Sequence, residues 1–196
     1  MADEKRPYRM KRRAELEELT RRRITESAVA LHGTLGPART SISALAEHAG
    51  VRRSTVYRHF PDEGSLFAAC TAHWMADNPV PDIGAWAATE DPDARLRAAL
   101  DALYPYYRRT ARMIENLIRD EPVSELVRQH FAAYHRYLAA ARDALVRGRR
   151  SRGRARTRER AAIGHALAFA TWRSLALDEG LDDAQAAELM VRLVAS

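Results

Sequence analysis

A single glycine between two short helical segments constrains this chain more than any other feature. Ser41 is a typical helix N-cap, and Leu45, Ala46 and Ala49 fall on one face of the helix that it would begin. Gly50 follows directly, and glycine takes a left-handed backbone angle without steric cost. The sequence therefore predicts a short helix, a sharp bend at Gly50 and a second helix soon after the bend.

The second helix, residues 53–59, carries mostly polar and cationic side chains. Val56 is its inward apolar residue, and Phe60 follows before Pro61 ends the helix. A short helix with such an outer face is typical of the major-groove helix of a helix-turn-helix. We expect Tyr57 and His59 to hold phosphate oxygens and the residues at the start of the helix to face the bases. The predicted DNA contacts are Ser41, Ser43, Arg52, Arg53, Ser54, Thr55, Tyr57, Arg58 and His59.

This stretch resembles the signature of the tetracycline-repressor (TetR) family of bacterial transcriptional regulators. The resemblance covers about the first third of the chain and rests on Ala49-Gly50-Val51 and on Thr55-Val56-Tyr57-Arg58-His59-Phe60-Pro61, with Leu66 beyond. Arg52 stands where the family usually has a capping serine, and Asp62-Glu63-Gly64 stands where it usually has a Lys-Glu pair. The resemblance implies about nine helices, an N-terminal DNA-binding domain and a C-terminal domain that encloses a small-molecule pocket.

The distribution of charge and proline suggests how the chain is divided. Residues 1–13 are basic and predict a flexible arm, residues 14–75 the three-helix DNA-binding domain with a connecting helix, and residues 76–196 an effector-binding and dimerisation domain. The segment 147–160 contains eight arginines and one glutamate. Because it has no aromatic residue to stack on bases, we favour a disordered loop over a second nucleic-acid patch.

The rest of the chain contains only helical patterns, so the predicted fold class is all-α. Pro105 is expected to interrupt the helix that begins near Pro92, since proline removes a backbone hydrogen bond. A further helical pattern runs from residue 159 to residue 177 before a final helix.

Aromatic and sulfur-containing side chains are concentrated in the second domain. Taken singly, each is more often a core residue than a pocket residue, but the family resemblance favours a pocket for the group. We expect an apolar effector that stacks on the rings, with hydrogen bonds from Tyr134 or His135. The predicted pocket residues are Trp86, Tyr104, Tyr107, Met113, Phe131, Tyr134, His135, Phe169 and Trp172.

Homodimerisation through the last two helices is expected, because a two-fold protein matches a palindromic operator. Small residues repeat every four positions in the first of these helices and would let a partner approach closely, while leucines supply the opposing ridge. The predicted interface residues are Ala162, Ala166, Ala170, Leu189 and Leu193.

Other classes of site find little support in the sequence. Cys70 is the only cysteine, which excludes an intrachain disulfide and a cysteine-based zinc site, and His130 and His135 lie five residues apart rather than three or four. No catalytic motif is present, and no apolar run approaches the roughly 18 residues of a membrane-spanning helix. We therefore expect a cytoplasmic repressor without cofactor, metal or membrane partner. The alternatives are a DNA-binding regulator without a small-molecule ligand and an all-helical enzyme.

Overall fold

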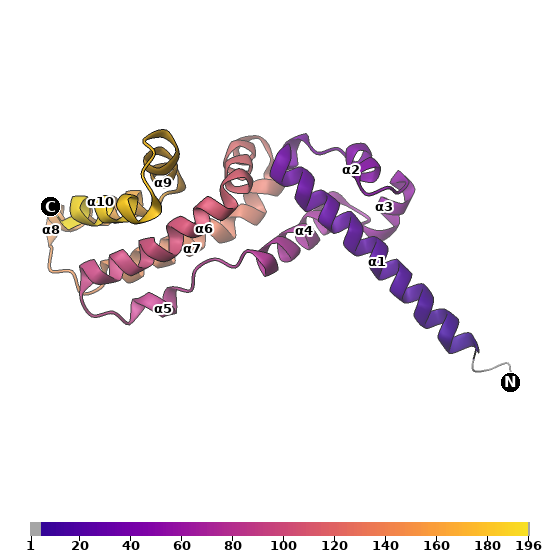
Figure 1. Cartoon of the computed structure of the whole chain (residues 1–196), viewed down its shortest axis with the longest axis horizontal. Helices are drawn as coiled ribbons and strands as arrows, with labels where there is room; N and C mark the ends of the chain where they lie inside the picture. Colours follow the sequence, from indigo (N-terminus) through magenta and orange to yellow (C-terminus); the bar gives the residue numbers. More distant parts are fainter. Residues whose placement is uncertain (1–4, 196) are drawn as a thin grey trace. The chain divides into compact units, whose positions relative to one another are not determined.

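The computed structural model describes residues 5–195, with side chains described from Met10 onward, and this range is built from helices without a strand (Figure 1). The all-α prediction is confirmed. The chain divides into two compact units, Met1–Asp77 with Glu115–His130 and Asn78–Ile114 with Phe131–Ser196. Residues 115–130, which the sequence analysis assigned to the second domain, thus belong to the first unit. Among the described helices, none is both long and apolar enough to cross a membrane.

The first unit places the helix-turn-helix on a small apolar core. Its helices are α1 (Lys5–Thr34), the 3₁₀ helix η1 (Pro37–Arg39), α2 (Ile42–His48), α3 (Arg53–His59) and α4 (Glu63–Asp77). In Figure 1, α2 and α3 form a corner beside α1. The side chains that meet there are apolar and almost fully buried, so they fix α3 against α1 and α4. They are Ile24, Ala28, Leu45, Ala46, Ala49, Val56, Phe60, Leu66 and Cys70.

Helix α1 begins much earlier than expected. The prediction of a flexible arm over residues 1–13 is wrong for residues 5–13, which are helical. Residues 1–4 lie outside the described residues. Pro7 falls in the first turn, where its missing N–H is not needed, and the following residues are mostly good helix formers. Arg13 and Glu17 add an ion pair one turn apart, with 3.1 Å between Nε and Oε1.

The second unit is a bundle of longer helices. It contains α5 (Ile83–Ala87), most of α6 (Pro92–Asp120) and α7 (Glu125–Val146), and then α8 (Gly153–Leu167), α9 (Phe169–Arg173), the π-helical turn η3 (Ser174–Asp178) and α10 (Asp183–Ala195). The 3₁₀ helix η2 (Glu121–Val123) joins α6 to α7 and lies in the first unit. Helices α6 and α7 therefore contribute residues to both units.

The interruption expected at Pro105 does not occur, because α6 continues through it as one helix. Pro105 is exposed, so the carbonyl of Asp101 that loses its helical partner can bond to water. On the opposite side of the helix, Leu103, Tyr104 and Tyr107 are buried. The burial of side chains before and after Pro105 in the sequence thus outweighs the loss of one helical hydrogen bond at the proline.

The helix expected over residues 159–177 is broken instead at Ala168, which has an extended backbone with φ −71° and ψ 135°. Two tyrosines of α6 satisfy the carbonyls left free at the end of α8. Tyr104 donates to the carbonyl of Ala166 at 2.9 Å, and Tyr107 donates to that of Leu167 at 2.6 Å. Ala166 is fully buried within its own chain, so its assignment to the dimer interface is corrected.

The disordered loop predicted over residues 147–160 is corrected for residues 153–160, which form the first two turns of α8. One arginine, Arg149, is folded inward and orders the segment. Its guanidinium lies 3.2 Å from Oε1 of Glu159 and 3.0 Å from Oδ1 of Asp93, and it donates to the carbonyl of Pro92 at 3.0 Å. Ser151 also donates to Glu159. These contacts hold the start of α8 against the start of α6.

Candidate functional site

The bend between α2 and α3 forms as the sequence predicts. The Oγ of Ser41 accepts the N–H of Ala44 at 3.1 Å and caps α2. Gly50 has φ +62°, and the N–H of Val51 returns to the carbonyl of Ala46 at 2.9 Å. This closes the turn and sets the direction in which α3 leaves it.

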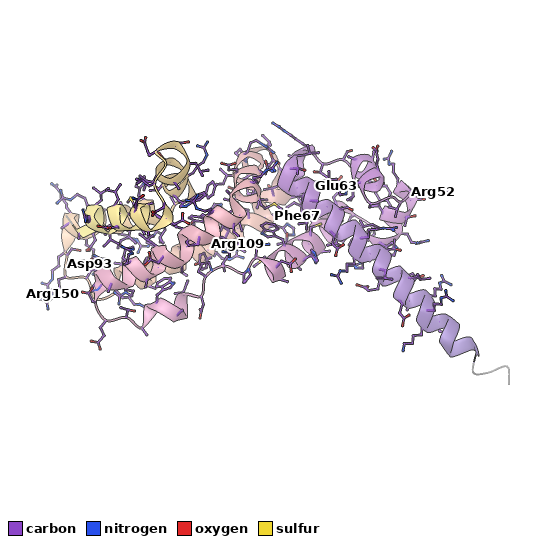
Figure 2. The ribbon with its side chains drawn as sticks, in the orientation of Figure 1. Arg52, Glu63, Phe67, Asp93, Arg109 and Arg150 are labelled. Carbon is purple, nitrogen blue, oxygen red and sulfur yellow. The ribbon has the colours of Figure 1, made fainter. Side chains whose placement is uncertain are left out.

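The nine predicted DNA contacts gather on the outer side of α2 and α3. Most are exposed, and Arg52 projects away from the ribbon at the start of α3 (Figure 2). The side chains of Thr55 and His59 are half-buried. Tyr57 is 46% exposed, which leaves its hydroxyl free to reach a phosphate. The face therefore carries cations and hydroxyls over an apolar base.

His59 differs from the other residues of this face. Its Nε2 is buried and has no hydrogen-bond partner among the residues that the structure describes. Burial lowers the pKa of the imidazole, and the charges of Arg58 and Arg21 lower it further. These effects favour the neutral form of the His59 imidazole in the protein without DNA.

Arg21 of α1 is a positioning residue that sequence reasoning missed. Its Nη1 donates to the carbonyl of His59 at 3.0 Å, and its guanidinium lies 4.5 Å from the ring centroid of Phe60. It satisfies a carbonyl at the end of α3 and ties that end to α1. Arg21 and His59 are 38 residues apart, so no local spacing could have revealed the pair.

The two departures from the family signature have different structural outcomes. Arg52 is the N-cap of α3 and provides no side-chain cap. Asp62, in contrast, caps α4, because its Oδ1 accepts the N–H of Ser65 at 2.6 Å while the Ser65 hydroxyl donates to the Asp62 carbonyl at 2.8 Å. The segment that lacks the usual lysine thus still starts the next helix.

Three polar residues at the end of α6 hold the segment that leads into α2. We call Asn116, Arg119 and Asp120 the α6 clamp. The side-chain amide of Asn116 donates to the carbonyls of His32 at 2.9 Å and Gly33 at 3.0 Å. Arg119 in turn donates to Oδ1 of Asn116 and to Oδ1 of Asp120, each at 2.8 Å. The clamp satisfies carbonyls that the end of α1 leaves free.

The clamp also grips the turn after α1. Arg119 donates to the carbonyl of Leu35 at 2.7 Å, and Oδ2 of Asp120 accepts the N–H of Ala38 at 3.0 Å. Between them lies Gly36, with φ +95° and ψ 152°, a conformation that essentially only glycine adopts. A Cβ at this position would overlap the side chains of both Arg119 and Asp120. The close approach therefore requires glycine.

Most of the predicted pocket residues meet in the second unit around Tyr107. Its ring lies 5.3 Å from that of Phe169 and 5.9 Å from that of Trp172, centroid to centroid. Tyr134 donates from its hydroxyl to the Tyr107 hydroxyl at 3.1 Å and stacks on Phe131 at 4.7 Å. Burial raises the pKa of Tyr107, which keeps its hydroxyl a hydrogen-bond donor.

The other predicted pocket residues vary in their surroundings. His135 is exposed, with its ring 5.0 Å from that of Phe131, and Met113 is buried. Trp86 of α5 is 4% exposed, and its indole nitrogen is buried without a hydrogen-bond partner in the described part of the chain. The indole nitrogen of Trp172, in contrast, donates to Asp183 at 2.9 Å. No group of three or more metal-ligating side chains is found among the described residues.

Comparison with known proteins finds a family whose sequence model matches the part of the chain that contains the helix-turn-helix. Residues 24–70 match the sequence model of the family described as bacterial regulatory proteins, tetR family. No curated protein sequence matches the chain.

Solved structures resemble the whole chain at low sequence identity. A TetR-like transcriptional regulator from Rhodococcus sp. RHA1 is 19% identical with a TM-score of 0.65, over 90% of this chain and 93% of that one. AibR, solved with isovaleryl coenzyme A and operator DNA, is 19% identical with a TM-score of 0.64, over 89% and 97%. A protein from Saccharomonospora viridis solved in complex with choline is 18% identical with a TM-score of 0.58, over 91% and 94%.

These likenesses extend the all-helical fold over both units, while the sequence match falls on the part that contains α2 and α3. The matched residues include the capped α2, the turn at Gly50 and the polar face of α3. Over residues 24–70, the chain therefore matches the sequence pattern of the bacterial regulatory proteins of the tetR family.

Proposed function

We propose that this protein is a repressor that binds a palindromic operator as a homodimer and is released by a small apolar effector. The observation that supports DNA binding most strongly is the outer face of α3. There Arg52, Arg53 and Arg58 are exposed together on a helix that the core and Arg21 hold in place. Cations and hydroxyls on a short rigid helix suit a major groove lined by phosphates.

The aromatic cluster of the second unit supports an effector site. Tyr107, Phe169 and Trp172 are aromatic rings on which a ligand could stack. Elsewhere in the second unit, the indole N–H of Trp86 is a buried donor without a partner among the described residues. A buried donor without a partner invites a water or a ligand atom. An apolar ring system fits the surroundings of the aromatic cluster.

Helix α6 offers a route by which such an effector would act on DNA binding. Its Tyr104 and Tyr107 belong to the cluster, and its last turns carry the α6 clamp on the segment before α2. Suppose that an effector binds more tightly when α6 is in one position than in another. If the two positions also differ in their affinity for DNA, the effector must change DNA binding. The coupling is reciprocal, so operator DNA would weaken effector binding equally.

A second candidate is a DNA-binding regulator without a small-molecule ligand. It is favoured by the packing of the cluster, because Tyr104, Tyr107 and Trp172 are fully buried and their polar atoms already have partners inside the chain. An effector would have to displace some of these contacts. The two candidates make opposite predictions in a ligand screen.

We expect apolar aromatic compounds to raise the melting temperature and to release operator DNA. A ligand at a hundred times its dissociation constant adds about 2.7 kcal/mol to the stability of the folded state. Phe131→Ala should reduce this response and leave DNA binding intact, while Leu126→Ala, at a half-buried position on the part of α7 that lies in the first unit, serves as the control. The screen includes choline and acyl-coenzyme A. Stabilisation by anionic metabolites alone would refute the apolar effector, and no stabilisation by any compound would favour the second candidate.

The dimer is expected to form through α8 and α10, together with Ala170, which the break at Ala168 places on α9. Leu189 and Leu193 lie one turn apart on α10 and are 37% and 56% exposed, and Ala162 and Ala170 also retain exposed surface. Leu189→Glu should therefore convert the dimer to a monomer in sedimentation at micromolar concentration, because it would bury a charge in the interface. Ala184→Glu, at an exposed position near the start of α10, should remain dimeric. A monomeric wild type, or a dimeric Leu189→Glu variant, would disprove this interface.

A further inference from the structure

The arginine-rich segment between α7 and α8 separates into inward and outward side chains. Arg149 is only 6% exposed and pairs with Glu159 and Asp93, while Nη1 of Arg160 lies 2.6 Å from Oδ1 of Asp143. These two arginines use the carboxylates that lie within reach of the segment. The remaining arginines are left without acidic partners.

The outward side chains form a surface that we call the arginine patch. All of its members are exposed, and none makes a side-chain hydrogen bond or ion pair within the part of the chain that the structure describes. Arg150 lies at the turn between α7 and α8 and points away from the ribbon (Figure 2). The patch consists of Arg147, Arg150, Arg152, Arg154, Arg156 and Arg158.

The patch is unfavourable to the helix that carries it. Arg152 is the N-cap of α8 without a side-chain cap, and no acidic residue lies in the first turn. Cations are disfavoured at the positive end of the helix dipole, and Arg154 and Arg158 are like charges one turn apart. Such local conflicts are expected at functional surfaces, where a bound partner relieves them. An anion is the partner that would relieve both.

The residues between the arginines narrow the class of anion. They are glycine, serine, alanine and threonine, and none is a large apolar side chain. Protein interfaces depend on buried aromatic or aliphatic anchors, and membrane-surface helices need an apolar face to insert, so neither partner fits this surface. Guanidinium groups match phosphate oxygens in paired hydrogen bonds. Six guanidinium groups within one short segment favour a partner that carries many phosphates along a polymer.

We propose that the arginine patch is a second DNA-binding surface, which contacts the phosphate backbone of a duplex without reading its sequence. The patch provides phosphate contacts and lies outside the helix-turn-helix that would place side chains in a groove, so its binding would depend on salt and not on sequence. This surface lies in the second unit and is separate from α3. The proposal does not depend on the effector or on the release mechanism.

The test uses the full chain with the reading helix disabled by Arg52→Ala, Arg53→Ala and Arg58→Ala. In this background, binding to a 30-base-pair duplex of arbitrary sequence is measured across salt concentrations. Adding Arg154→Gln and Arg158→Gln should weaken binding and should make the slope of log K against log salt shallower by about 1.8, or about 0.9 for each lost phosphate contact. Glutamine is a good helix former and removes the like-charge pair, so α8 should stay folded, as circular dichroism would verify.

The matched control is Arg112→Gln with Arg136→Gln in the same background. Both are exposed arginines of the second unit without a hydrogen bond or ion pair in the described structure, one on α6 and one on α7. This pair removes the same charge and should leave the slope unchanged. Equal slopes for the two double variants, or no change in either, would overturn the proposal. Competition by polyglutamate as effective as that by duplex DNA would also overturn it, in favour of an acidic protein partner.

Discussion

Replacing Gly36 by alanine is expected to destabilise the first unit by about 3 kcal/mol or more. Gly36 has φ +95°, and a Cβ there would overlap Arg119 and Asp120. The variant must strain its backbone and also open the α6 clamp. Opening the clamp would break the hydrogen bond from the Ala38 N–H to the Asp120 carboxylate. Urea unfolding followed by fluorescence and circular dichroism would measure the loss.

Gly50→Ala separates the two contributions. Gly50 also has a positive φ, +62°, but a Cβ there would meet nothing within 4 Å. Alanine at this position should cost only the left-handed backbone penalty, about 1 kcal/mol. The excess loss in Gly36→Ala over Gly50→Ala therefore reports the clamp together with the greater backbone strain at Gly36. Equal losses would mean that the clamp contributes nothing to the stability of the first unit.

Replacing Arg53 by alanine is expected to weaken operator binding by about 1 to 3 kcal/mol, or roughly fivefold to 150-fold, and to relax the preference at one base position. Tyr57→Phe should instead weaken binding to all sequences alike, because its hydroxyl is predicted to hold a phosphate. Competition binding against operators with single base changes measures both effects. Arg136→Ala, an exposed arginine of the second unit, is the control and should leave the base preference unchanged. Sequence-dependent loss in Tyr57→Phe would reverse the assigned roles.

The helix-turn-helix could be predicted because its determinants are local. Ser41 caps α2, Gly50 takes the positive φ, and Leu45, Val56 and Phe60 are buried, all within a stretch of some 20 residues. Capping, turn chemistry and helical periodicity act over a few residues and can be read from one sequence.

The contacts that position the helix-turn-helix could not be predicted in this way. Asn116 and Asp120 bond to residues more than 80 positions away, and Arg21 to a residue 38 positions away. Each looks like an ordinary polar residue on a helix surface. Only the folded chain shows that Asp120 is 2% exposed and that the close approach of Arg119 depends on a glycine.

Local signals were also overridden where tertiary contacts were strong. Proline predicted a break within α6, yet the helix continues past Pro105 because the side chains on either side of it are buried. Ala168 carries no breaking signal, yet the helix ends there because Tyr104 and Tyr107 satisfy the freed carbonyls. Tertiary contacts thus override the local signal at both positions: side-chain burial continues α6, and long-range hydrogen bonds end α8.

The central claim is that the outer face of α3 recognises a two-fold symmetric DNA site. Selection of bound fragments from the source genome, with the wild type and with the Arg52→Ala, Arg53→Ala, Arg58→Ala variant in parallel, tests it most directly. The wild type should enrich palindromic fragments whose half-sites lie about one helical turn, or a multiple of it, apart, and the variant should enrich none of them. Enrichment of the same fragments by the variant, or of no fragment by the wild type, would contradict the claim.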